Sequence, residues 1–212
     1  NKESKTTIAN EESMESRLEQ ILNDALIKAT DTYSVPPQII WVDNSTIATL
    51  GNFSASTGKA KAKKTFNVSA LVAASLSNGT VLNYRACLPE GKRRILYVDT
   101  EQSRYHCHNV LARILKLAGL PTDMDNQNLD FIGLREYTPA IRMEVIDYAL
   151  AHNHGYGLVI IDGIRDLLLD INNAGESVEV INKMMEWSSK YDLHIHCVLH
   201  QNKGDNNVRG HI

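Results

Sequence analysis

One stretch of the sequence has the residue types and spacing of a phosphate-binding loop. Residues 58–65 read GKAKAKKT, and such a loop has Gly, four residues, Gly, Lys and then Ser or Thr. Gly58, Lys64 and Thr65 stand at the expected places, and Lys63 takes the place of the second Gly. We expect Gly58 to turn main-chain N–H groups towards a phosphate, Lys64 to reach the β- and γ-phosphates, and Thr65 to bind Mg²⁺. The stretch predicts a site for ATP and Mg²⁺, and a lysine-rich solvated turn is the alternative.

The segments on either side of this loop are expected to hold it in place. Residues 65–76 carry apolar side chains on one helical face and precede Gly79, which predicts a helix that ends there. Such a helix directs its positive N-terminal end at the phosphate. Before the loop, we interpret residues 47–50 as the strand that enters it, with residues 43–44 as the preceding turn.

The rest of the chain alternates between strand and helix patterns. Continuous apolar runs at 94–98 and 158–162 are typical of buried parallel strands. Further strands are predicted at 39–42, 80–88, 129–132 and 194–199, and further helices at 103–118, 140–152 and 178–191. This alternation predicts an α/β fold with a mainly parallel central sheet covered by helices on both faces.

The N-terminal part has a different pattern. Residues 13–30 predict an amphipathic helix, and the Val-Pro-Pro at 35–37 ends this segment. We therefore divide the chain into an N-terminal helical extension, residues 1–35, and a main domain, residues 36–212. The apolar stripe of the helix is expected to pack against the core or against a neighbouring subunit.

Two acidic residues follow predicted strands, where ligands of parallel sheets bind. Asp162 ends the run at 158–162, which is the pattern of an acid that holds Mg²⁺; an ordinary turn aspartate is the alternative. Glu101 lies just past the strand at 94–98, and we expect it to activate a water as general base. A carboxylate that favours a helix start is its alternative role. We place the strand of Glu101 beside the strand that enters the phosphate loop.

Taken together, these motifs resemble the RecA-like ATPases. The similarity rests on the loop G-x-x-K-x-x-K-T from Gly58 to Thr65, on VDTE at 98–101, on IID at 160–162 and on LHQ at 199–201. Enzymes of the AAA+ class place a Glu directly after the metal Asp, whereas this sequence has Gly163 there. The resemblance is greatest to the RepA-type hexameric helicases and related ATPases of plasmids and mobile elements. It implies a RecA-like three-layer αβα sandwich and Mg²⁺-dependent ATP hydrolysis.

The same resemblance implies further site residues. Lys61 and Lys63 would join the nucleotide-binding loop, and Gln201 or His200 would be the polar sensor at the tip of the last strand. Arg209 would contact the γ-phosphate, in this subunit or in a neighbour of a ring. The implied partners are further copies of the chain and DNA. The family also has strands beyond this point, so we expect the domain to continue after residue 212.

Composition restricts the setting of the protein. The 212 residues carry a net charge of −3, which gives no general signal for nucleic acid, so a DNA contact would need a local basic patch. We expect no membrane segment, because no apolar run approaches ~20 residues, and we expect no secretory signal. Three widely spaced cysteines favour reduced thiols and a cytoplasmic location. The histidines at 194, 196 and 200 share a strand face; we expect packed or hydrogen-bonded rings there rather than a zinc site.

Two functions from different classes remain open after these steps. The first is an ATPase that drives a helicase-like or DNA-remodelling reaction for a plasmid, phage or mobile element. The second is an ATP-binding regulatory or scaffold switch with little turnover. Glu101 favours turnover, whereas Lys63 in the loop leaves room for the switch. A small-molecule kinase is less favoured, because the sequence has no lid segment with clustered arginines.

Overall fold

The computed structural model describes residues 2–58, 64–168 and 174–200, and the chain divides into two compact units, Asn1–Val35 and Pro36–Ile212. The first unit contains one long helix, α1 (Lys2–Ala25), which begins earlier and ends earlier than the predicted span of 13–30. Its apolar side chains at Met14, Leu18, Ile21 and Leu22 are at least half exposed. Across the described ranges, no helix is both long and apolar enough to span a membrane.

The second unit is built on a sheet of five parallel strands. The order across the sheet is β3-β9-β8-β6-β7. Every neighbouring pair is parallel, and the middle strands are buried at residues 95–99, 156–162 and 194–199. The strands are β3 (Phe53–Gly58), β6 (Arg94–Asp99), β7 (Leu129–Gly133), β8 (Tyr156–Asp162) and β9 (His194–His200).

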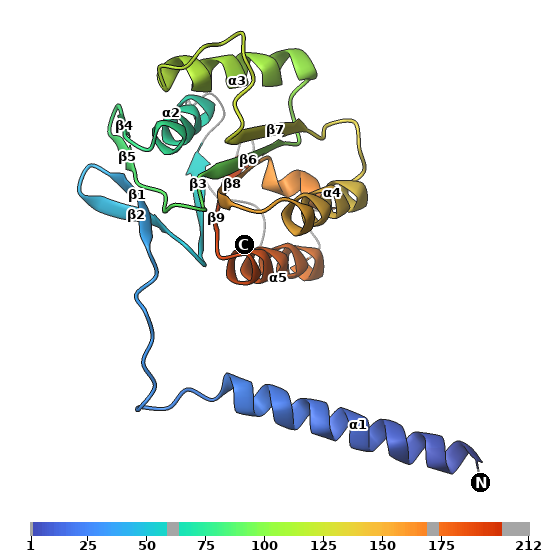
Figure 1. Cartoon of the computed structure of the whole chain (residues 1–212). Helices are drawn as coiled ribbons and strands as arrows, with labels where there is room; N and C mark the ends of the chain where they lie inside the picture. Colours follow the sequence, from blue (N-terminus) through green and yellow to red (C-terminus); the bar gives the residue numbers. More distant parts are fainter. Residues whose placement is uncertain (1, 59–63, 169–173, 201–212) are drawn as a thin grey trace. The chain divides into compact units, whose positions relative to one another are not determined.

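Helices cover both faces of this sheet, as Figure 1 shows. Because side chains alternate between the faces of a strand, β6 sends Ile95 and Tyr97 into one core and Leu96 and Val98 into the other. The first core lies under α2 and α3, and the second lies under α4 and α5. The predicted RecA-like three-layer αβα sandwich is therefore confirmed. The helices are α2 (Lys64–Ser77), α3 (Arg104–Leu117), α4 (Pro139–His152) and α5 (Ala174–Lys190), with a short 3₁₀ turn, η1 (Ile164–Leu167).

A small antiparallel sheet packs against the first core. Its order is β2-β1-β5-β4, and its strands are β1 (Gln38–Val42), β2 (Ser45–Thr49), β4 (Thr80–Val81) and β5 (Tyr84–Ala86). The prediction that residues 47–50 form the strand entering the phosphate loop is wrong, because they belong largely to β2. The turn at 43–44 joins β1 to β2, and β3 leads to the loop instead. The predicted strand at 80–88 is a short hairpin of β4 and β5.

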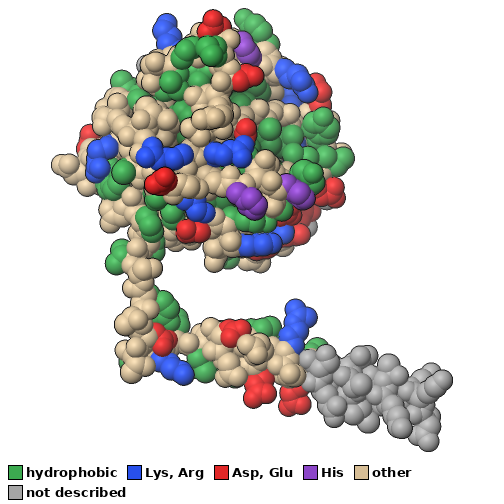
Figure 2. Space-filling view, viewed as in Figure 1, with side chains coloured by type: hydrophobic (Ala, Val, Ile, Leu, Met, Phe, Trp, Pro, Cys, Tyr) green, Lys and Arg blue, Asp and Glu red, His purple; other side chains and the backbone are tan. Residues whose placement is uncertain are grey.

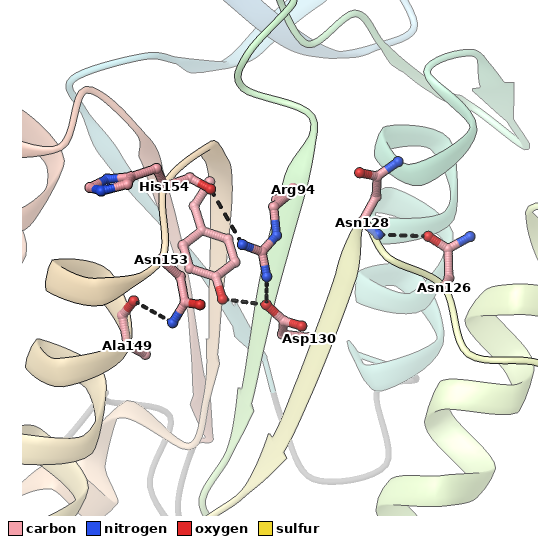
Figure 3. A network of polar contacts seen from close by, with 8 residues as sticks. Arg94, Asn126, Asn128, Asp130, Ala149, Asn153 and His154 are labelled. Carbon is pink, nitrogen blue, oxygen red and sulfur yellow. Dashed lines mark hydrogen bonds and ion pairs between the residues drawn. The ribbon is translucent and has the colours of Figure 1, made fainter.

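A polar network fastens the strands at the end of the sheet opposite the phosphate loop. Arg94, at the start of β6, donates to Asp130 of β7 over 2.5 Å, and the hydroxyl of Tyr156, at the start of β8, donates to the same carboxylate. The guanidinium of Arg94 also lies 4.8 Å from the centre of the Tyr156 ring. Figure 3 shows Arg94 and Asp130 meeting near the amino ends of their strands. Since ligands of parallel sheets bind at the carboxyl ends, this network is structural.

Candidate functional site

The phosphate-loop lysine lies at the carboxyl ends of two neighbouring strands. Strand β3 ends at Gly58, and α2 begins with Lys64 and Thr65. The Nζ atom of Lys64 donates to the carbonyl oxygen of Gly58 over 2.5 Å and to that of Leu199 in β9 over 3.0 Å. The ammonium group thus lies near the N-terminal turn of α2, and helix N-termini are sites that bind anions.

Charges from two other strands reach this lysine. Burial lowers the pKa of Lys64, and the carboxylates of Asp162 and Glu101 act in the opposite direction. Asp162 is the last residue of β8, and Glu101 follows β6. The fold therefore brings together Lys64, Asp162 and Glu101, which are separated by up to a hundred residues in the sequence.

Asp162 is held on the face of the sheet that carries α2. It is only 3% exposed, and it lies on the same face of β8 as Leu158 and Ile160, whose side chains are in the core under α2 and α3. The hydroxyl of Tyr97 donates to its Oδ2 atom over 2.9 Å. Burial first, and then the charge of Asp162, raise the pKa of Tyr97, so this hydroxyl stays protonated as a donor.

Glu101 follows a strand that has a different position in the sheet from the predicted one. Its strand, β6, does not neighbour β3, because β9 and β8 lie between them. The prediction that Glu101 follows the strand beside the phosphate-loop strand is therefore wrong. Instead β6 pairs with β8, and Asp99 stands in register with Asp162. Glu101, which is exposed, lies just past this pair, next to the strand that carries Asp162.

Asp99 and Thr100 are site residues to which the sequence analysis gave no role. Asp99 is fully buried and its Oδ1 atom accepts from the main-chain N–H groups of Glu101 (3.0 Å) and Gln102 (2.7 Å). Burial raises the pKa of Asp99, while these hydrogen bonds lower it. The signal for Asp99 in the sequence was an acid at the end of an apolar run, the same signal that identified Asp162.

Gly163 explains why no acid follows Asp162. Its φ angle is +97°, which L side chains rarely adopt, and a Cβ atom there would lie 2.2 Å from Oγ1 of Thr100. The same atom would be 2.9 Å from Oδ2 of Asp166. This position therefore excludes the glutamate that AAA+ enzymes place there.

Two of the predicted histidines, His194 and His196, are hydrogen-bonded as predicted and join β9 to β3. Nδ1 of His194 lies 2.9 Å from the carbonyl oxygen of Thr49, so it carries the hydrogen, and Nε2 accepts from Ser54 Oγ over 2.8 Å. Ser54 then accepts from Nδ1 of His196 over 2.8 Å, and Nε2 of His196 accepts from Ser56 over 2.8 Å. Burial lowers the pKa of both histidines to about 4, which keeps them neutral.

Four predicted site residues, Lys61, Lys63, Gln201 and Arg209, lie outside the described residues. Because a lysine at the second glycine position restricts the backbone, we expect this loop to be disordered or rearranged without nucleotide, and that prediction also concerns residues outside the described ranges. The side chain of His200 is not described either. Within the ranges that the structure describes, no group of three or more His, Cys, Asp or Glu could hold a metal ion. His106 and His108 of α3 are exposed, whereas Cys107 between them is buried.

Comparison with known families adds an independent observation. A family model described as an AAA domain matches residues 15–206, which is most of the chain. The chain belongs to the AAA-domain family. A search of curated proteins finds no match to it. Membership of a P-loop NTPase family agrees with the parallel sheet and with the lysine at the start of α2, and it supports a P-loop ATPase.

The donor set of this AAA domain fits nucleotide and Mg²⁺. Mg²⁺ is usually held by one or two carboxylates together with phosphate oxygens and waters, rather than by a closed protein cage. Asp162 offers a carboxylate at the end of β8, and Thr65 offers a hydroxyl in the first turn of α2. Lys64 supplies the positive charge that a triphosphate needs.

Proposed function

We propose that this AAA domain is a Mg²⁺-dependent ATPase of the RecA-like, RepA-type branch, in which Glu101 is the general base. The observation that carries this proposal is the position of Lys64, which begins α2 and contacts the ends of β3 and β9, while Asp162 ends β8 and Glu101 follows β6. Three groups therefore meet at the same end of the parallel sheet: a cation to bind phosphate, an acid to bind the metal and a second acid to activate water. That combination is what phosphoryl transfer to water requires.

Each residue has a distinct part in this proposal. Gly58 and the N-terminus of α2 would offer main-chain N–H groups to the phosphates, and Lys64 would neutralise their charge. Thr65 and Asp162 would hold Mg²⁺, which supplies charge stabilisation on the transferred phosphoryl group. Glu101 would accept the proton of the attacking water. Lys61, Lys63, Gln201 and Arg209 keep the parts implied by the resemblance: loop lysines, sensor and arginine at the γ-phosphate.

Two structural features support the RecA-like branch in particular. Glu101 follows β6, the strand next to β8, and Gly163 leaves no space for a glutamate directly after Asp162. In addition, β9 lies between β3 and β8, and its Leu199 carbonyl contacts Lys64. In the sequence, Gln201 comes two positions after Leu199, so it would suit the part of a sensor beside Lys64.

The proposal also covers the location, oligomeric state and partner of this ATPase. We propose a cytoplasmic ATPase that works as a homo-oligomer, with a ring as one form, and acts on DNA in a plasmid, phage or mobile element. Met14, Leu18, Ile21 and Leu22 recur in α1 with helical spacing, and an apolar stripe of this kind is suited to packing against another copy of the chain. Figure 2 shows basic side chains scattered among acidic and apolar ones on the visible face, so a DNA contact would be local. The free thiols of all three cysteines agree with a reducing compartment.

Steady-state ATP hydrolysis with Mg²⁺, measured alone and with single- or double-stranded DNA, tests this function. We expect turnover that requires Mg²⁺, stimulation by one of the two DNA forms, and loss of both in Lys64→Ala. A chain that binds ATP but hydrolyses none under any of these conditions would contradict the ATPase and favour the regulatory switch. Strand separation of a forked DNA then distinguishes a helicase from a remodelling ATPase.

A further inference from the structure

We infer that Thr100, assisted by Asp99, is a positioning residue that sets where Glu101 stands relative to Asp162. This inference rests on the proposed function, because it gives Glu101 the part of general base. Neither residue is expected to touch the nucleotide. Their effect is transmitted through the main chain of two turns, one after β6 and one after β8.

Asp99 fixes the turn that carries Glu101. Its Oδ1 atom accepts from the N–H groups of Glu101 and Gln102, and its Oδ2 atom accepts from the amide of Gln102 over 3.0 Å. Three hydrogen bonds to the carboxylate of Asp99 therefore hold the turn that contains Glu101. Asp99 is itself fixed, because it lies in register with Asp162 at the last paired position of the two strands. These bonds restrict the backbone of Glu101.

Thr100 fastens this turn to the one that follows Asp162. Its N–H donates to the carbonyl oxygen of Asp162 over 3.1 Å. Its hydroxyl oxygen lies 3.1 Å from that same oxygen, 2.9 Å from the carbonyl oxygen of Gly163 and 3.0 Å from Oδ2 of Asp166. The side chain is 1% exposed, so water does not compete for these contacts. Three acceptors thus share one buried hydroxyl.

Further contacts hold the second turn in place. The main-chain N–H of Asp166 donates to the carbonyl oxygen of Gly163 over 2.9 Å, and the guanidinium of Arg142 donates to the carbonyl oxygen of Asp166 over 2.5 Å. The same guanidinium donates to the carbonyl oxygen of Leu134, which follows β7. Because this turn is held from two sides, the Thr100 hydroxyl has a rigid partner. A misplacement of the base by about 1 Å can cost about 10²-fold in rate, so such a connection matters for the chemistry.

Thr100→Val tests this inference, because it removes the hydroxyl and keeps the shape of the side chain. We expect kcat to fall by about 10-fold or more, while ATP affinity changes by less than about 2-fold. Thr100→Ser, which restores the hydroxyl, should recover most of the rate, and Asp99→Asn should be milder than Asp99→Ala. Thr122→Val, at an exposed threonine, is the matched control and should behave as the parent.

A double variant separates positioning from a general loss of structure. If Thr100 acts only through Glu101, Thr100→Val combined with Glu101→Gln should be no slower than Glu101→Gln alone. Multiplying effects would overturn the inference, as would a Thr100→Ser variant no faster than Thr100→Val.

Hydrogen exchange in the nucleotide-free protein decides the matter even if the parent shows no turnover. Thr100→Val should speed exchange at the amides of Glu101, Gln102 and Asp166 together, whereas Thr122→Val should not. Unchanged exchange at these amides would contradict the connection between the two turns. Absence of turnover in the parent with faster exchange in Thr100→Val would instead contradict the ATPase proposal alone.

Discussion

Acidification should weaken the attachment of β3 to β9, because their shared hydrogen bonds need neutral histidines. His194 is 2% exposed and His196 is 5% exposed, and burial lowers the pKa of each from 6.5 to about 4. Each ring accepts one hydrogen bond on Nε2 and donates one from Nδ1, so a second proton would break a serine contact. The charge of Asp162 favours protonation of His196, while that of His194 opposes it.

The sign and size of this effect follow from linkage. The folded-state pKa lies below the unfolded one, so the stabilisation is complete above pH 6.5 and is lost as the pH falls from there towards 4. With these values, each histidine destabilises the fold by about 2 kcal/mol at pH 5 relative to pH 7. For the pair, whose protonation is coupled, the unfolding free energy falls by about 4 kcal/mol between pH 7 and pH 5.

Urea unfolding at pH 7, 6 and 5, followed by fluorescence, measures this loss. The parent should lose about 2 kcal/mol more of its unfolding free energy between pH 7 and pH 5 than His196→Gln does. The exposed His108 offers a matched control, and His108→Gln should show the same pH dependence as the parent. An equal loss in the parent and in His196→Gln would refute the reasoning that these rings are held neutral by burial.

Three further substitutions follow from the geometry of the site. Lys64→Ala should abolish ATP binding, measured by calorimetry, while its circular dichroism stays that of the parent; unchanged affinity would refute the phosphate-loop assignment. Asp162→Asn should weaken ATP binding and raise the Mg²⁺ concentration needed for turnover, and an unaltered Mg²⁺ titration would place the metal elsewhere. Gly163→Ala should lower stability by about 1–3 kcal/mol in thermal unfolding, because its backbone is left-handed and its Cβ would meet Thr100; a parent-like melting temperature would show that this turn rearranges freely.

The buried strands and the helices could be predicted from the sequence because their patterns are local. The apolar runs that became β6 and β8 leave few alternatives, and Asp162 at the end of its run was identified in this way. The same holds for the helix that begins at Lys64, whose apolar residues recur with helical spacing. Each of these predictions depends on neighbouring residues only.

The strand that enters the phosphate loop was missed for a physical reason. Residues 53–58 read FSASTG, and apart from Phe53 these residues are small or polar. This composition suits β3, because the strand lies at the edge of the sheet and alternates between exposed and half-buried positions. Ser54 and Ser56 are explained by the rings of His194 and His196, which lie about 140 residues away. Only the paired strands reveal why serines suit this place. The apolar residues 47–50 were therefore the more convincing strand in the sequence.

Strand order limited the prediction of the site in the same way. The sequence placed Glu101 and Asp162 at strand ends, but it contains no local signal that β9 and β8 separate β3 from β6. The role proposed for Thr100 and the need for glycine at 163 depend on a contact between two turns that are about 60 residues apart. Such a contact has no periodicity from which it could be inferred.

The most direct test of the central claim is a comparison of ATP binding and ATP hydrolysis in Glu101→Gln. Glutamine keeps the size of the side chain and removes its capacity to accept a proton. We predict ATP affinity close to that of the parent and a hydrolysis rate lower by about 10²-fold or more, the usual contribution of a positioned base. Hydrolysis by Glu101→Gln at the parent rate would contradict the claim, because the base would then lie elsewhere in the molecule.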